Sequence, residues 1–456
     1  IADWKKPARG SARLARPAAE TTAHAKVPLH LSPQESPSST PGRAVSSRLR
    51  LLLVAIRRIE SRGNDLAVGD HGRSRGPYQI SLAYWLDAGM PRAAYLRDVW
   101  RADRAAMAPE YEFYVFDTVR HSCDINHAFY NIDSVEGAWN TGSDRDQTDL
   151  PVLGMPIHGG YHALPPNDRL YNLRAEMAAL IEGAGVAVKY HHHEGGGPGQ
   201  CEIEVLPVPL LSAADHGLLL KYIVRLTADR AGKVATFMPK PLYNAAGSGM
   251  HVHQALFQGD RNLFWEEQGY SGLSETALHY IGGLLEHGPA LLALTSPSTN
   301  SYKRLVPGFE APVNLIFGRG NRTAAVRIPE EGRTAETKRI EFRPGDATGN
   351  LYLTLSAMLM AGIDGIKRKI DPRVEGFGPF EVPLSLMPEE DRKRVRSLPL
   401  ALGEVLDALE KDHQFLLAGD VFDEALIRAW IELKRKESLD VRSRRHPREI
   451  SLYLDV

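Results

Sequence analysis

The stretch Pro109-Glu-Tyr-Glu-Phe-Tyr-Val-Phe116 is dense in aromatic and β-branched side chains and predicts a β-strand. Side chains alternate along a strand, so Glu110 and Glu112 are expected on one face, opposite an apolar face. Two neighbouring carboxylates repel each other unless a cation lies between them. The strand is therefore either one wall of a metal site or a solvated sheet edge.

A second strand of this kind is predicted further along the chain. Residues 191–194 read His-His-His-Glu, a glycine-rich run follows, and residues 200–205 again alternate carboxylates with apolar side chains. Glu202 and Glu204 share one face of that segment, and the glycine run can fold Glu194 towards Glu202. Three consecutive histidines by themselves indicate either metal binding or a polar bend.

Two more segments extend the same pattern. Residues 247–253 (Gly-Ser-Gly-Met-His-Val-His) predict a tight turn entering a strand, and residues 338–343 (Lys-Arg-Ile-Glu-Phe-Arg) alternate charged with apolar side chains. Carboxylates with a single imidazole suit Mg²⁺ or Mn²⁺ better than zinc. Phosphoryl transfer needs such a metal cavity together with arginine donors, which are available at Arg304, Arg322, Arg327, Arg339 and Arg343.

The composition is that of a globular protein with balanced charge. Of the 456 residues, 43% are hydrophobic and 24% are charged, and the formal net charge is −1. This balance argues against a protein that binds mainly nucleic acid or anionic membranes. No apolar run reaches the roughly 18 residues that a membrane span needs. The two cysteines, Cys123 and Cys201, are too few for a disulfide framework, so a reducing, cytoplasmic location is expected.

The chain divides into three segments by composition. Residues 1–45 are rich in Ala, Pro, Ser, Thr and Arg and are expected to form a disordered basic tail. Residues 46–107 predict a short helical segment, part of which weakly resembles a fragment of the lysozyme and lytic-transglycosylase family. That resemblance rests on Glu60, the family's general acid, and on Gly76-x-x-Gln-Ile80; an inert fused segment is the preferred interpretation. Residues 108–456 are expected to form one α+β domain.

Beyond residue 108 the motifs occur in an order that resembles one known family. They are PEYEF from Pro109, HHE with a following GQxE from His192 to Glu202, GSGMHVH from Gly247, NSYKRLVPGFEAPV from Asn300, NRTAAVRIP from Asn321, RIEFR from Arg339 and the closing HPREISLYLDV. Residues 108–456 thus resemble glutamine synthetase of the bacterial type I class. The resemblance implies a curved antiparallel β-sheet cavity with surrounding helices. It also implies ATP-dependent ligation of ammonia to the γ-carboxylate of glutamate through γ-glutamyl phosphate.

The resemblance further implies two metal centres in each site, occupied by Mg²⁺ or Mn²⁺. One ion would face the glutamate carboxylate and would be held by Glu112, Glu194 and Glu202. The other ion would lie next to the ATP phosphates and would be held by Glu110, His251 and Glu341.

Substrate contacts and catalytic roles are implied in the same way. Glutamate would be bound by Arg304, Arg343, Gly247 and Glu310. The nucleotide would be contacted by His192, His253, Arg327 and Arg339. The catalytic residues would be Arg304, Arg322, which stabilises the transferring phosphoryl group, and Glu310, whose loop closes over the site and which helps to deprotonate ammonium.

Three features depart from the family pattern. Ala246 occupies the place of an Asn that helps to hold glutamate, and the segment from Val382 to Pro388 lacks the Tyr that some members adenylylate. Family members begin with a β-grasp domain that covers the neighbouring subunit's site in a double-ring dodecamer and donates an Asp that helps to bind ammonium. No such domain is recognisable in residues 1–107. A homo-oligomer that uses glutamate, ammonia and ATP is expected, with no nucleic-acid or membrane partner.

Three alternatives remain open at the level of sequence. The first is a γ-glutamyl ligase that acts on a larger amine, such as a polyamine or ethanolamine. The second is a non-catalytic family member that binds nucleotide and metal without turnover. The third is a glycan-binding or glycan-cleaving activity of residues 46–107 that depends on Glu60.

Overall fold

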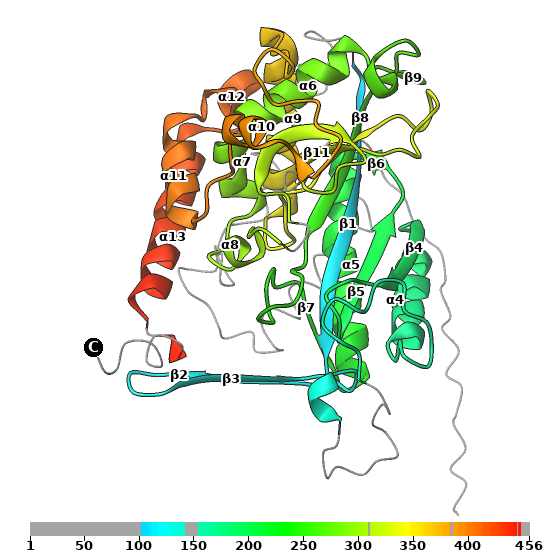
Figure 1. The fold of residues 1–456 in the computed structure, drawn as a ribbon, viewed down its shortest axis with the longest axis vertical. Helices are drawn as coiled ribbons and strands as arrows, with labels where there is room; N and C mark the ends of the chain where they lie inside the picture. The colour runs from blue at the N-terminus through cyan, green and yellow to red at the C-terminus, as the bar shows by residue number, and fades with distance from the viewer. Residues whose placement is uncertain (1–101, 142–153, 309–310, 384–385, 445, 448–456) are drawn as a thin grey trace, which may run out of the picture. The chain divides into compact units, whose positions relative to one another are not determined.

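The computed structural model describes residues 102–141, 154–308, 311–383, 386–444 and 446–447 (Figure 1). The predictions for the basic tail, the lysozyme-like segment with Glu60, and Glu310 therefore fall outside the described residues. Within the described residues, no helix is long and apolar enough to cross a membrane. Cys123 and Cys201 are both free thiols, as the cysteine count predicted.

A large sheet is organised around one long central strand. This strand, β1 (Arg104–Phe116), pairs with β5 (Gln200–Val205) on one side and with β8 (Met250–Gln258) on the other. The sheet order is β10-β11-β12-β8-β1-β5-β4. The remaining bounds on that path are β4 (Val188–His193), β10 (Asn314–Arg319), β11 (Ala324–Ile328) and β12 (Ile340–Phe342).

Short strands complete the β-structure. Within the main sheet β6 (Val208–Pro209) and β7 (Val234–Thr236) pair with β1, and β9 (Arg261–Asn262) pairs with β8. A separate two-stranded sheet is formed by β2 (Thr118–Cys123) and β3 (Ala128–Asp133), which lies apart from the main sheet in Figure 1.

One strand pair departs from the expected antiparallel sheet. All pairings of the main sheet are antiparallel except β10 with β11, which run parallel with a register shift between Asn314 and Phe317. The alternation of side chains is the same in parallel and antiparallel strands. The sequence analysis predicted no strand at β10 or β11, and an alternating pattern there would not have determined the direction of the pairing.

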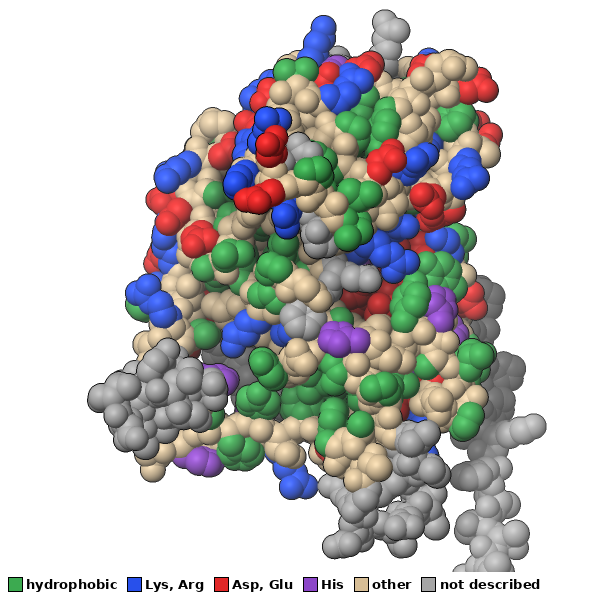
Figure 2. Space-filling view, viewed as in Figure 1, with side chains coloured by type: hydrophobic (Ala, Val, Ile, Leu, Met, Phe, Trp, Pro, Cys, Tyr) green, Lys and Arg blue, Asp and Glu red, His purple; other side chains and the backbone are tan. Residues whose placement is uncertain are grey.

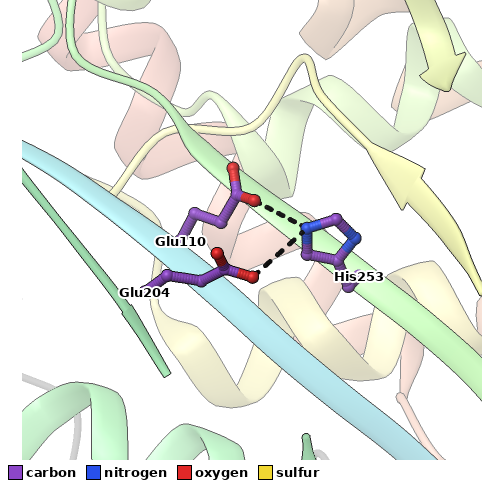
Figure 3. A group of neighbouring side chains, drawn as sticks. All are labelled: Glu110, Glu204 and His253. Carbon is purple, nitrogen blue, oxygen red and sulfur yellow. Dashed lines mark hydrogen bonds and ion pairs between the residues drawn. The ribbon is translucent and has the colours of Figure 1, made fainter. Parts of the chain in front are cut away.

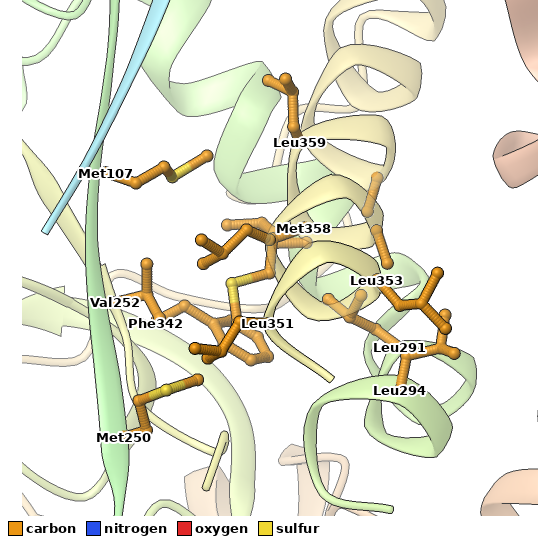
Figure 4. Close-up of a cluster of buried hydrophobic side chains, with 14 of the residues drawn as sticks. Met107, Met250, Val252, Leu291, Leu294, Phe342, Leu351, Leu353, Met358 and Leu359 are labelled. Atoms are coloured by element: carbon orange, nitrogen blue, oxygen red, sulfur yellow. The ribbon is translucent and has the colours of Figure 1, made fainter. Parts of the chain in front are cut away.

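The predicted alternation along the central strands is confirmed. Tyr111 and Phe113 of β1 and Ile203 of β5 are buried in the apolar core, whereas the carboxylates between them point the other way. Figure 4 shows Met250, Val252 and Phe342 of the sheet packed towards Met358 on a facing helix. One face of the sheet therefore builds the core, and the other face carries the charged residues.

Helices cover the apolar face of the sheet. The described α-helices are α4 (Tyr171–Gly183), α5 (Leu210–Arg230), α6 (Glu275–Glu286), α7 (Gly288–Thr295), α8 (Ser301–Arg304), α9 (Leu351–Arg368), α10 (Glu389–Arg394), α11 (Leu402–Lys411), α12 (Gln414–Leu417) and α13 (Glu424–Ser443). Short 3₁₀ turns occur at η2 (Ala138–Asn140), η3 (Tyr270–Gly272) and η5 (Ala418–Asp420).

The buried helix α9 is fixed at its start and along its length. The Asn350 side chain accepts hydrogen bonds from Tyr352 N and Leu353 N, which satisfies two of the free N–H groups at the helix start. Further along, α9 crosses α6 so closely that a methyl group on Gly283 would lie 2.0 Å from the Ala361 carbonyl oxygen. Glycine is therefore required at this crossing for a packing reason.

A buried histidine joins three helical segments. His287, between α6 and α7, contacts Asp412 through Nδ1 at 2.8 Å and Asp364 of α9 through Nε2 at 2.9 Å. Its ring also stacks on Phe415, with a centroid separation of 4.0 Å. Burial alone lowers the pKa of His287, but the two carboxylates outweigh burial and raise the pKa above its ordinary value.

We expect His287→Gln to lower the free energy of unfolding by about 1–3 kcal/mol, because both carboxylates lose a charged partner. The raised pKa adds stability that is fully present below the unfolded-state pKa of about 6.5 and is lost as pH rises through the folded-state pKa. Urea unfolding at pH 6 and pH 9 should show a larger loss at pH 6. An equal loss at both pH values would contradict a charged His287.

Candidate active site

A cavity of about 450 Å³ opens on the charged face of the sheet. Its walls combine carboxylates with guanidinium groups, and Figure 2 shows acidic side chains recessed in a hollow with basic side chains beside it. The predicted site residues that line this cavity are Glu110, Glu112, His192, Glu194, Glu202, Gly247, His251, Arg304, Arg322, Arg327 and Arg343. Residues more than 200 positions apart in the sequence thus meet around one space.

Strand register brings the carboxylates together. Glu110 of β1 lies opposite Glu204 of β5 on one side and opposite His251 of β8 on the other. Glu112 lies opposite Glu202 in the same ladder. Because directly opposed side chains on one face are near neighbours, the register alone creates a dense cluster of negative charge.

One expected metal-ligand set is assembled in the structure. Potential ligand atoms of Glu110, His251 and Glu341 all lie within 4.8 Å of one another, and all three residues are buried. His251 Nδ1 lies 3.0 Å from Glu110 Oε2 and 3.6 Å from Glu341 Oε1. These residues come from β1, β8 and β12, which are neighbours in the sheet.

The second expected set is assembled in a different form. Glu194 and Glu202 lie with His192, which is 3.4 Å from Glu194 through Nδ1 and 3.5 Å from Glu202 through Nε2. Glu112, the third expected ligand, accepts a hydrogen bond from Gly249 N at 2.6 Å and lies 3.7 Å from His251 Nε2. It lines the same cavity without belonging to that close group.

The electrostatics of these carboxylates fit a bound divalent cation. Burial is the largest cause that raises the pKa of Glu202 well above its ordinary value, and repulsion from the neighbouring carboxylates of Glu110, Glu194, Glu112 and Glu204 adds to it. The nearby protein groups therefore leave part of this negative charge uncompensated. Several oxygen donors with one imidazole form the donor set that hard divalent cations prefer.

Glu341 is held in its charged form by two arginines. Burial raises its pKa, but Arg343 and Arg327 outweigh burial, and the pKa falls to about 2. Arg327 Nη1 lies 2.6 Å from Glu341 Oε2, and Arg343 Nη1 bonds the other carboxylate oxygen. One carboxylate therefore orients two guanidinium groups that face the cavity.

Arg304 is oriented by backbone carbonyls. Its Nη1 donates to Pro344 O at 2.9 Å and to Gly345 O at 3.2 Å, and the side chain is buried. Arg322 also lines the cavity, with its guanidinium carbon 5.6 Å from the centre of the Tyr161 ring. Arg304 and Arg322 thus present fixed positive charge to the space that the carboxylates enclose.

Two predicted nucleotide contacts, His253 and Arg339, are not among the residues that line the described cavity. Arg339 Nε donates to His253 Nδ1 at 3.2 Å. Since Nδ1 accepts this hydrogen bond, we assign the ring proton to Nε2, which lies 2.6 Å from Glu110 Oε1. His253 therefore donates to the carboxylate of Glu110, a member of the expected metal-ligand set.

Glu204 is a buried residue of the site for which the sequence analysis predicted no role. Figure 3 shows its carboxylate beside Glu110 and His253. Potential ligand atoms of these three residues all lie within 4.8 Å of one another. Oε1 of Glu204 is 2.7 Å from Lys189 Nζ, whereas Oε2 has no hydrogen-bond partner among the described residues. Its shared strand face with Glu202 was the available signal.

Four other lining residues were missed because they lie outside the motifs. His158 and Tyr161 come from the loop before α4, Tyr190 comes from β4, and Glu331 follows β11. His158, Tyr161 and Glu331 lie outside the helices and strands, so no strand or helix period marks them. No feature of the sequence alone identified them as part of the site.

A buried wall of carboxylates with arginines around one cavity defines a class of protein, the enzymes that use divalent cations to transfer a phosphoryl group. Residues 95–453 match the family model described as glutamine synthetase, catalytic domain. The chain belongs to the glutamine synthetase family.

Known relatives of the chain carry the same family name. The chain is 51% identical to glutamine synthetase of Streptomyces coelicolor over 80% of this chain and 76% of that protein. It is 47% identical to glutamine synthetase of Mycolicibacterium smegmatis over 79% of this chain and 76% of that protein.

Solved structures show the same similarity in three dimensions. Plasmodium falciparum glutamine synthetase aligns with a TM-score of 0.69 and 27% identity, covering 79% of this chain and 77% of that one. A GmaS complex with ADP aligns with a TM-score of 0.61 and 30% identity, covering 77% of this chain and 73% of that one. The predicted fold class is therefore confirmed.

We expect Glu202→Gln to have opposite effects on folding and on cation binding. Removing one repelled charge should raise the melting temperature of the metal-free protein, because the raised pKa marks a carboxylate that destabilises the fold at neutral pH. Mn²⁺ affinity should fall at least about tenfold, as measured by calorimetry. In the unsubstituted protein, Mn²⁺ at 100 times its Kd should stabilise by about 2.7 kcal/mol.

The exposed Glu432 on α13 provides the matched control, since Glu432→Gln also removes one carboxylate. This variant should change neither the metal-free melting temperature nor Mn²⁺ affinity appreciably. Unchanged Mn²⁺ binding in Glu202→Gln would exclude Glu202 as a ligand.

Proposed function

We propose that the cavity catalyses the ATP-dependent ligation of ammonia to the γ-carboxylate of glutamate, which gives glutamine, ADP and phosphate. Membership of the glutamine synthetase family and identity of about half to named glutamine synthetases support this reaction. The observation that carries the proposal is the meeting of two carboxylate clusters with four arginines in one cavity.

The reaction requires activation of a poor acyl donor. The γ-carboxylate of glutamate attacks the γ-phosphorus of ATP, the bond to the bridging oxygen breaks, and ADP leaves with that oxygen. Ammonia then attacks the acyl carbon of γ-glutamyl phosphate, inorganic phosphate leaves, and the ammonium nitrogen loses a proton. Water must be excluded between these steps, because it would hydrolyse the acyl phosphate.

We assign the metal ions of the reaction to Mg²⁺ or Mn²⁺, at two ions or more per site. Glu110, His251 and Glu341 would hold one ion, and Glu112, Glu194 and Glu202 the other. When bound, these ions neutralise the charge on phosphate and carboxylate oxygens. The buried, oxygen-rich donor sets support this assignment.

The arginines are assigned to the substrates by their place in the cavity. Arg304 and Arg343, with the Gly247 backbone, would bind the carboxylates of glutamate, and Arg322 would stabilise the phosphoryl group in transfer. Preorganised guanidinium groups serve this role because they need no reorientation during the reaction. The hydrogen bonds that fix Arg304 and Arg343 support it.

Further residues around the cavity are assigned to the nucleotide and to ammonium. His192, His253, Arg327 and Arg339 would contact the nucleotide; His192 and Arg327 line the cavity, and Arg339 donates a hydrogen bond to His253. Glu310 would close over the site and help to deprotonate ammonium; it follows Gly308, which lines the cavity. We also propose a homo-oligomer, with residues 1–45 and most of the 46–107 segment outside the catalytic domain. The expected boundary at residue 108 falls too late, because β1 of the main sheet already begins at Arg104 and Met107 is part of the core.

We expect phosphate release from ATP to require both glutamate and ammonium, and to fall about 100-fold or more in Glu341→Gln. The substitution removes one negative charge from the Glu110–His251–Glu341 set. It also removes the charged partner of two cavity arginines, Arg327 and Arg343. Glu432→Gln, on the exposed face of α13, should keep the original rate. Tight ATP binding without phosphate release would instead indicate a non-catalytic member of the family.

We expect Ala246→Asn to lower the KM for glutamate about fivefold with little change in kcat, because it adds one hydrogen-bonding side chain to the cavity wall. The backbone there is already fixed, since Tyr114 donates a 2.7 Å hydrogen bond to Ala246 O. Asn244→Gly is the control: Asn244 is exposed, and glycine accepts its φ of 60°. An unchanged KM in Ala246→Asn would contradict the assignment of this wall to glutamate.

A further inference from the structure

A second buried cluster of ionisable side chains lies outside the cavity. Glu136, Asp168 and His193 have polar atoms within 4.8 Å of one another, and each residue is at most 2% exposed. Glu136 lies between β3 and η2, Asp168 lies before α4, and His193 ends β4. None of the three lines the cavity.

The polar atoms of this cluster are already satisfied by the protein. Asp168 Oδ2 forms a 2.6 Å ion pair with Arg174 Nη2. Glu136 Oε1 accepts from Arg169 N at 2.8 Å, and Oε2 accepts from Gly199 N at 2.8 Å while lying 3.0 Å from His193 Nε2. A buried carboxylate with three donors has no need of a cation, so the cluster is a structural clamp.

The clamp contacts both ends of the glycine-rich loop at residues 194–199. His193 stands immediately before Glu194, and Gly199 stands at the other end of the loop, just before β5. Glu136 Oε2 contacts both positions at once. The loop is also closed by a hydrogen bond from Glu194 N to Gln200 O at 3.0 Å. Glu136 therefore fixes the backbone on either side of Glu194.

The His193 ring transmits this constraint to Glu194. Its Nδ1 lies 3.0 Å from the Glu194 carbonyl oxygen and its Nε2 lies 3.0 Å from Glu136, so the ring bridges the clamp and the ligand-bearing residue. The ring packs against the backbone at Gly160, where a methyl group would lie only 2.6 Å from Nδ1, so glycine is required there to admit the ring in this orientation. The position of Glu194 in the cavity thus depends on Glu136.

We infer that Glu136 is a positioning residue for the cation site formed by Glu194 and Glu202, acting through His193 and the glycine-rich loop. The inference rests on the proposed function for the identity of that site. Outer-shell partners of this kind typically change metal affinity by about 10–100-fold when they are removed. Glu136 itself touches neither substrate nor cation.

The test is a titration of the full chain carrying Glu136→Gln with Mn²⁺, in which binding is monitored by electron paramagnetic resonance. The amide places N–H groups where donors now meet the carboxylate, so one end of the loop is released. We expect one class of Mn²⁺ site to weaken at least about tenfold while the class that includes Glu110, His251 and Glu341 keeps its affinity.

Asp168→Asn is the matched control within the same cluster. It breaks the buried pair with Arg174 but leaves the contacts of Glu136 with the loop in place. We expect a lower melting temperature with unchanged Mn²⁺ affinity. Equal Mn²⁺ binding by Glu136→Gln and the unsubstituted protein, or an equal loss of affinity in both variants, would overturn the positioning role.

Two further measurements keep the outcomes distinct. If Glu136→Gln does not fold, Glu136→Asp retains the charge but is shorter by one methylene, and it should weaken the same class of site. Glutamine formation is measured in parallel on the unsubstituted protein. Absence of turnover together with site-selective loss of Mn²⁺ binding would overturn the proposed reaction while supporting the role of Glu136.

Discussion

Repulsion between buried carboxylates on one sheet face is the constraint on which the rest of the structure depends. Register places Glu110 opposite Glu204 and Glu112 opposite Glu202, where the surroundings screen charge far less than water does. Histidines and arginines offset part of that charge, while burial and the neighbouring carboxylates still raise the pKa of Glu202 well above its ordinary value. Such a face persists because the opposite face of the same strands buries a continuous apolar core against the helices.

On the charged face, single carboxylates contact two basic side chains at once. Glu341 orients Arg327 and Arg343 while also belonging to a possible ligand set, and Glu110 receives hydrogen bonds from two histidines while serving in the same set. A change at either carboxylate alters several groups together, so the site behaves as one electrostatic unit.

Much of this site could be predicted from the sequence, because the alternation of side chains along a strand is a local property. The faces of Glu110, Glu112, Glu202 and Glu204 followed from period two, and the motif resemblance supplied Arg304 and Arg343. The sequence did not predict the strand direction at β10 and β11, the hydrogen bond between Arg339 and His253, or the loop residues Tyr161 and His158. Those features depend on contacts between segments far apart in the chain, which no local period encodes. Glu136 was likewise missed because its partners are 33 to 63 positions away.

The central position of β1 also determines which genetic changes the protein tolerates. Substitutions along β1 alter one side chain at a time, but a one-residue insertion or deletion within it shifts every later side chain to the opposite face. The carboxylates of Glu110 and Glu112 would then point into the apolar core, and Tyr111 and Phe113 would point into the cavity. The number of residues within β1 therefore matters to the cavity as much as the identities of Glu110 and Glu112.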